Sequence, residues 1–247
     1  MRHLVLVPLM LTACIADPST SEPITLTTDP TSVVADGTSL VTISVAANTD
    51  GDVTLTASSG SFVDAALPAA GAPATTTLKT GRGTTDVAYR AGLDAGTAVI
   101  TATSGALSTT LDLPVSAVGP KHLSLTPDRT TVTGDGISFV ELDVEALTDS
   151  QAQVSRGTVV QFAVCCTDAG GHAIACAAGA APFVLPKLGR IDDGHSLSVH
   201  AVTMHVATPK TALLRARYSA TIPTSAPCGD PSVGEVSSED VTVTVEP

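Results

Sequence analysis

The chain has 247 residues, with 24 acidic and 12 basic side chains and a formal net charge of −12. Such an acidic surface repels phosphate backbones, so we expect no nucleic-acid partner. The length suits one large or two ordinary domains, and with aromatics at 2% and no tryptophan the core must be aliphatic. Thr, Val, Ala, Ser and Gly dominate and no segment has sustained helical periodicity, which predicts an all-β protein.

The N-terminus has the layout of a secretory signal. Met1-Arg2-His3 precedes an apolar run that is too short to cross a bilayer as a helix, which needs about 20 residues. The ending Leu11-Thr12-Ala13-Cys14 resembles the lipobox of bacterial lipoproteins, in which the cysteine is lipidated and becomes the first residue after cleavage. The resemblance implies a signal peptide over 1–13, a lipid on Cys14 and a tether over 14–22. An ordinary signal peptide with a chance cysteine and a buried N-terminal strand are the alternatives.

An internal repeat follows the tether. Residues 26–47 align without a gap to residues 125–146 at an offset of 99, with 11 of 22 positions identical. Each copy has an Asp-Gly turn and then an alternating run, with Val41, Ile43 and Val45 matched in the second copy by Val140, Leu142 and Val144. Alternation of this kind is typical of a strand with one buried and one solvated face. We expect these residues, and Val33 and Val132, to be buried at equivalent places.

Further strands are predicted from the same alternation between turn residues. They are Val53–Ala57, Ala74–Lys79, Thr85–Arg90, Ala98–Thr103 and Thr109–Val115 in the first copy, and Thr158–Cys165, Leu197–Val206, Ala212–Thr221 and Val241–Val245 in the second. The segment around Gly119-Pro120 is predicted to be a short linker. A spacing near 100 residues matches one β-sandwich per copy, so we expect two tandem antiparallel sandwiches over 23–116 and 120–247.

The order of these motifs resembles bacterial Ig-like domains of the invasin and intimin type. The matching residues are Ala35-Asp36-Gly37 with the closing strand over 96–102, and in the second copy Gly134-Asp135-Gly136 with the strand over 156–162. The closing strand of the second copy, over 212–217, departs from the pattern. The resemblance implies an Ig-like fold but not a particular function, because one fold hosts many functions.

Motifs for catalysis or cofactor binding are absent from the sequence, and we expect no enzyme activity, no cofactor and no metal site. His195, His200 and His205 are spaced by five, which alternates faces on a strand, so solvated histidines are favoured over a ligand set. The segments Asn48–Asp52 and Asp192–Gly194 superficially resemble part of a calcium loop, and an Asp-Gly turn explains both.

Four further cysteines lie in the second copy: Cys165, Cys166, Cys176 and Cys228. An even number in an exported protein predicts disulfides, and four cysteines allow three pairings. The vicinal pairing strains the backbone, and strand alternation sends the Cys165 and Cys166 sulfurs to opposite faces. We expect Cys165–Cys176 with Cys166–Cys228, ahead of the crossed arrangement. Free or metal-bound thiols are the remaining alternative.

Together these features predict a lipid-anchored protein of the bacterial cell envelope, at the outer membrane or cell surface. Its Ig-like modules would act as a stalk or adhesion surface, with the membrane reached through Cys14 and a protein partner at the envelope. The alternative is a ligand-binding or accessory subunit that uses the loops of the second module. The second copy is longer through insertions around 165–195 and 219–237, so convergence of these loops into a pocket would favour the alternative.

Overall fold

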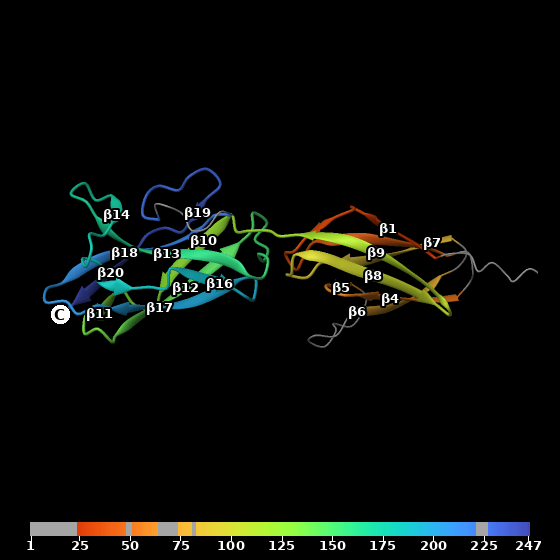
Figure 1. The fold of residues 1–247 in the computed structure, drawn as a ribbon, viewed down its shortest axis with the longest axis horizontal. Coiled ribbons are helices and arrows are strands. Elements are labelled where there is room, and N and C mark those ends of the chain that lie inside the picture. Colours follow the sequence, from red (N-terminus) through yellow and green to blue (C-terminus); the bar gives the residue numbers. More distant parts are fainter. Residues whose placement is uncertain (1–23, 48–50, 64–73, 81–82, 221–226) are drawn as a thin grey trace, which may run out of the picture.

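The computed structural model describes residues 24–47, 51–63, 74–80, 83–220 and 227–247, and all regular structure in these ranges is β-strand. Two lobes lie end to end, and the C-terminus is at the end far from the first lobe (Figure 1). In the part of the chain that the structure describes, no helix has the length and apolar character needed to cross a bilayer.

The first module pairs a four-stranded sheet, in the order β1-β3-β7-β5, with a five-stranded sheet, β2-β9-β8-β4-β6. The strands are β1 (Thr25–Asp29), β2 (Val33–Val34), β3 (Leu40–Ala47), β4 (Gly51–Ala57), β5 (Ser61–Phe62), β6 (Ala74–Thr80), β7 (Gly83–Arg90), β8 (Gly96–Ser104) and β9 (Leu107–Ser116). Every strand predicted for this copy is present within a few residues.

The second module repeats this plan with sheets β10-β12-β17-β15 and β11-β20-β18-β13-β14, with β16 and β19 pairing β13 and β18. The strands are β10 (His122–Pro127), β11 (Thr131–Thr133), β12 (Phe139–Leu147), β13 (Thr158–Thr167), β14 (Ala173–Ala175), β15 (Phe183–Val184), β16 (Leu188–Ile191), β17 (Ser196–Thr203), β18 (Lys210–Tyr218), β19 (Val236–Ser237) and β20 (Val241–Glu246). Two predicted strand ends were wrong. The strand predicted over Leu197–Val206 is β17, which ends at Thr203, and the strand predicted over Ala212–Thr221 is β18, which ends at Tyr218.

The sheets are antiparallel except at one edge in each module. There β2 runs parallel to β9, and β11 runs parallel to β20. In each copy the N-terminal segment contributes its first strand to one sheet and its next strand to the other, so it supplies an edge to both. The predicted fold class, two antiparallel Ig-like sandwiches, is therefore confirmed, with one short parallel pair at an edge of each module.

Each sandwich has its own core, formed by the inward rows of its two sheets. The predicted equivalence of the two copies is confirmed for four residue pairs, all buried: Val33/Val132, Val41/Val140, Ile43/Leu142 and Val45/Val144. These rows bury aliphatic side chains on one face while the intervening residues stay more exposed, as strand geometry requires. The two copies are thus the same fold with different outer surfaces.

Candidate functional surfaces

A short turn with the sequence Asp-Gly-x-Ser occurs three times, beginning at Asp36, Asp135 and Asp193. In each, one carboxylate oxygen accepts from the two backbone N–H groups two and three residues on, and the other accepts from the serine hydroxyl. At Asp135 the bonds from the Ser138 N–H, the Ile137 N–H and the Ser138 hydroxyl hold the carboxyl pKa at about 2. The aspartate carboxylate in each turn therefore stabilises the turn itself by accepting hydrogen bonds from its own backbone.

The insertion before the last strand gives the second module an outer face unlike that of the first. In the first module β8 and β9 join in a tight hairpin that pairs Ser104 with Leu107. In the second, residues 219–235 separate β18 from β19, and Cys228 packs on the outer face of the sheet with Ala163 and Cys165. The insertion therefore covers part of this face at Cys228, whereas the tight β8–β9 hairpin leaves the first module without an insertion at the equivalent position.

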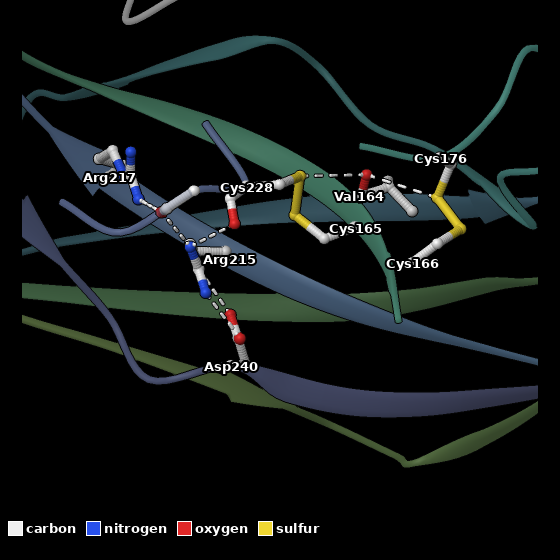
Figure 2. The surroundings of a disulfide bond; sticks show 9 residues. Val164, Cys165, Cys166, Cys176, Arg215, Arg217, Cys228 and Asp240 are labelled. Atoms are coloured by element: carbon white, nitrogen blue, oxygen red, sulfur yellow. Dashed lines mark hydrogen bonds and ion pairs between the residues drawn. A yellow bond between two sulfur atoms is a disulfide. The ribbon is translucent and has the colours of Figure 1, made fainter. Parts of the chain in front are cut away.

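Two disulfides hold the inserted segments (Figure 2). Cys165 is bonded to Cys228 and Cys166 to Cys176, with S–S distances of 2.03 and 2.11 Å. The predicted pairing was wrong, and the crossed arrangement is present. Adjacent cysteines do leave β13 on opposite faces, but Cys228 of the insertion packs on the outer face, which carries Cys165. The β13–β14 hairpin, in which Cys166 is opposite Ile174, brings Cys176 to Cys166 instead.

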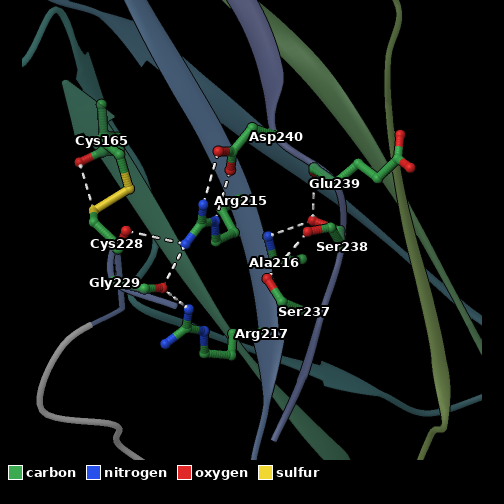
Figure 3. A network of polar contacts seen from close by, with 11 residues as sticks. Cys165, Arg215, Ala216, Arg217, Cys228, Gly229, Ser237, Ser238, Glu239 and Asp240 are labelled. Atoms are coloured by element: carbon green, nitrogen blue, oxygen red, sulfur yellow. Dashed lines mark hydrogen bonds and ion pairs between the residues drawn. A yellow bond between two sulfur atoms is a disulfide. The ribbon is translucent and has the colours of Figure 1, made fainter. Parts of the chain in front are cut away.

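Two arginines of β18 bind the inserted segment beside the first disulfide (Figure 3). The Arg215 guanidinium makes two parallel bonds to the Asp240 carboxylate, 2.6 and 2.7 Å long, and donates to the carbonyls of Cys228 and Gly229. These bonds to Asp240 raise the pKa of Arg215, and the bidentate geometry gives the pair directional strength.

Arg217 lies beneath the same segment, with its side chain 2% exposed. It donates to the Gly229 carbonyl and lies 3.5 Å from a Glu235 carboxylate oxygen. Burial lowers the pKa of Arg217, while the nearby Glu235 carboxylate opposes the shift. A charge this deeply buried is tolerable only when paired and hydrogen-bonded, so the insertion and the arginine depend on each other.

A β-bulge directs Asp240 toward Arg215. Leu214 pairs with Val241 but Arg217 pairs with Ser237, so residues 238–240 contain one more residue than the two opposite them. Within the bulge the Ser238 hydroxyl accepts from the Ala216 N–H at 3.0 Å, and the Ser238 N–H donates to the Ala216 carbonyl at 2.9 Å. The bulge keeps the strand bonded while it redirects a side chain.

Sequence reasoning did not find this arginine network. Its signal was present, because Arg215 and Arg217 alternate with apolar residues on a strand beside the cysteine strand. The pattern places two arginines on the outer face of a sheet, but it does not reveal that an inserted segment covers that face.

The two modules contact each other directly at the linker. The Ser155 hydroxyl of the second module donates to the Ala35 carbonyl of the first at 2.9 Å, and accepts from the Val118 N–H at 2.7 Å. The Arg156 N–H donates to the Leu93 carbonyl at 2.8 Å. Because Ser155 and Ala35 are both buried, this junction is a packed contact in addition to a covalent tether.

A cavity of about 480 Å³ lies beside the junction. It is lined by Ala95 of the first module, the linker residues Ala117–Gly119, and residues of the second module that include Arg156, Leu188 and Tyr218. Both long insertions contribute to it, the segment 165–195 through Leu188 and the segment 219–237 through Ser219 and Ala220. The two insertions therefore both reach this cavity.

Replacing Ser155 by alanine should loosen the junction. The change leaves the partly buried Val118 N–H and the buried Ala35 carbonyl without their shared partner, at a cost of about 1–3 kcal/mol for a buried group. We expect residual dipolar couplings of both modules to fit one alignment tensor in the wild type and to need two in the variant. Ser124→Ala, on the exposed face of β10, is the control. A single tensor in Ser155→Ala would show that the hydroxyl does not set the module orientation.

The remaining predicted site residues are dispersed. The His195 ring lies 3.2 Å from Glu145, His200 stacks on Phe139, and His205 is exposed beyond β17. Within the described ranges no three His, Cys, Asp or Glu side chains group as metal ligands. The Asp193 carboxylate of the second calcium-like segment accepts from its own turn. Cys14 and the start of Asn48–Asp52 lie outside the described residues.

These observations define the class: an all-β chain of two tandem Ig-like sandwiches, the second carrying a disulfide-held insertion. No family model matches the sequence, and no curated protein matches it. Among solved structures, the adhesin InvE of Yersinia pseudotuberculosis matches 90% of this chain and 58% of its own, with a TM-score of 0.53 and 17% identity. Invasin, a bacterial integrin-binding protein, matches 88% of this chain and 39% of its own, with a TM-score of 0.54 and 15% identity.

This chain thus spans less than two thirds of either of these proteins. At such low identity the likeness establishes the fold, which is of the invasin type, and not the activity. The predicted resemblance to invasin-type Ig-like domains is therefore confirmed at the level of fold.

Proposed function

We propose that this chain is a lipid-anchored protein of the bacterial cell envelope whose two Ig-like modules form a stalk that presents an adhesive surface. The observation that carries the proposal is the junction, where buried hydrogen bonds join the modules end to end. A stalk needs such a junction, because a free linker would let the second module fold back toward the membrane. The similarity in fold to an adhesin and to a bacterial integrin-binding protein supports the same function.

The anchor follows from Leu11-Thr12-Ala13-Cys14. A lipidated Cys14 would place the attachment near the first module and the C-terminal end of the second module farthest from the membrane (Figure 1). Two or more acyl chains hold a protein stably at a bilayer, whereas one chain does not. Ile15 after the cysteine, in place of Asp, favours the outer membrane in a bacterium that has two membranes.

Cys14→Ala tests the anchor. We expect the variant to lose metabolic labelling by palmitate and to leave the membrane fraction or keep its uncleaved signal, because no other residue supplies the acceptor sulfur. The control is Ser19→Ala in the tether, which should label like the wild type, and density-gradient fractionation then assigns the membrane. Equal labelling of Cys14→Ala and the wild type would contradict the proposed anchor.

A second candidate function is ligand binding by the second module as part of an envelope complex. The observation that favours it is the junction cavity of about 480 Å³, which the first module alone does not form. Leu188→Arg would fill this cavity from its rim. Loss of co-purification with an envelope complex in this variant, with the stalk intact, would support the second candidate over the first.

We propose no enzymatic activity for either case. Arg215 and Asp240 bind each other, Cys165 and Cys228 are joined in a disulfide, and among the described residues these groups form no pair of nucleophile and base. Hydrolysis of ester or glycosidic substrates by the purified protein would contradict this.

A further inference from the structure

Large apolar side chains gather on one outer surface of the second module. Of the twelve exposed large apolar side chains in the described residues, five lie here: Ile137, Phe139, Val184, Val202 and Met204. Phe139 is opposite Val202, and Val202 is opposite Val184, so three adjacent strands contribute to one continuous row. We call these five residues the apolar row. Contiguous exposed apolar surface of this kind marks an interaction site more often than scattered residues do.

The apolar row lies at the free end of the stalk. The linker leads into β10 at His122, which pairs with Leu147 at the junction end of β12. Phe139 begins β12 and therefore lies at its opposite end, away from the first module. The Phe139 ring also stacks on His200, with centroids 4.3 Å apart and planes at 27°, so it is held against the sheet surface.

An acidic row continues the same face toward the junction. After Phe139, the outward positions of β12 are Glu141, Asp143 and Glu145. The facing outward residues of β10 and β17 are Ser124 and Thr126 on one side and His200, Ser198 and Ser196 on the other, and none of them is Lys or Arg. Arg129, which shares a small cavity with Ile137 and Phe139, is held by Asp128 at 2.6 Å. The His195 ring lies 3.2 Å from Glu145, but no Lys or Arg faces the three carboxylates from the neighbouring strands. This face therefore presents apolar surface followed by a row of negative charge that no Lys or Arg of these strands neutralises.

The first module provides an internal comparison. Its residues at the positions of Phe139, Val202 and Val184 are Leu40, Arg90 and Ser61, which are paired in the same way. At the positions of Glu141, Asp143 and Glu145 it has Thr42, Ser44 and Ala46. The fold is thus compatible with a face that is neither continuously apolar nor acidic. The second module differs in character at five of these six positions, since Leu40 and Phe139 are both exposed and apolar, and the five changed side chains lie outside its core.

We infer that this face of the second module binds a protein segment in which large apolar side chains adjoin lysines or arginines. The apolar side chains would cover the apolar row, and the cations would face Glu141, Asp143 and Glu145. Charge complementarity selects such a partner and disfavours anionic lipid, which the acidic row repels. The location of the partner at the cell envelope rests on the proposed function. The chemistry of the partner is inferred from this face of the second module alone.

The probe is a synthetic peptide of three leucines followed by three lysines spaced by glycine. The full chain is held in uncharged detergent micelles, and binding of the labelled peptide is followed by fluorescence anisotropy. Val202→Arg with Val184→Ser, which gives this face the residues of the first module, should weaken binding about tenfold or more. Glu141→Gln with Asp143→Asn and Glu145→Gln should weaken it and remove its dependence on salt.

Leu40→Phe with Arg90→Val is the matched control in the first module and should leave the affinity for the peptide within about twofold. Peptides with glutamate for lysine, or serine for leucine, should not bind. All substituted positions are at least partly exposed, so we expect the variants to fold. An unchanged melting temperature of each variant would show that it has folded. Equal affinity of wild type and both variants would overturn the inference. So would self-association of the wild type that Val202→Arg abolishes, because a second copy would then occupy the face. Neither outcome depends on Cys14, so failure here is distinct from failure of the anchor.

Discussion

Replacing Cys165 and Cys228 together by serine should lower the free energy of unfolding of the second module by about 4 kcal/mol. The bond closes a loop with a sequence separation of 63, and the chain-entropy model assigns a value of that size to such a loop. The insertion that carries Cys228 also holds Gly229 against Arg215, so its release would further expose the partly buried ion pair of Arg215 and Asp240. Hydrogen exchange under increasing urea, which reports each module separately, measures the change.

Cys166→Ser with Cys176→Ser is the matched control. Its loop has a sequence separation of 10, for which the same model gives about 2–3 kcal/mol, and its hairpin does not cover the arginines. The first module should keep its stability in both variants. An equal or larger loss in the control would show that the arginine cover contributes little and that loop length does not govern the effect.

Replacing Leu142 by alanine should destabilise the second module by about 2–4 kcal/mol, because the side chain is fully buried in β12 and its removal leaves a cavity. Its equivalent in the first module is Ile43, which is also fully buried. Ile43→Ala should therefore lower the stability of the first module by a similar amount. The two variants together test whether the cores are separate.

Leu40→Ala is the control for this pair, because Leu40 is 51% exposed on the equivalent strand and should cost well under 1 kcal/mol. Denaturant unfolding combined with hydrogen exchange distinguishes the modules. A loss that spreads equally over both modules in Leu142→Ala would show one cooperative unit, with the junction coupling the two cores.

The fold followed from local information to a large extent. The alternation of Val140, Leu142 and Val144 assigns a buried face to β12 without knowledge of any neighbour, because successive side chains of a strand point to opposite sides. Short strands such as β15 and β19 escaped prediction, since two residues contain no periodicity. They form because longer strands beside them offer free hydrogen-bonding groups.

The residue pattern was enough to predict the all-β class, the repeat at a spacing of 99 residues and the buried side of the strands β3 and β12. The cysteine pairing, the arginines under the insertion and the apolar row depend on contacts between distant segments, which no local pattern contains. The alternation of side chains along a strand predicts to which face of the sheet each one points, and the prediction for Cys165 and Cys166 was correct. Which group contacts that side chain depends on where a distant segment runs, and the packing of Cys228 on the outer face is a property of the packed module.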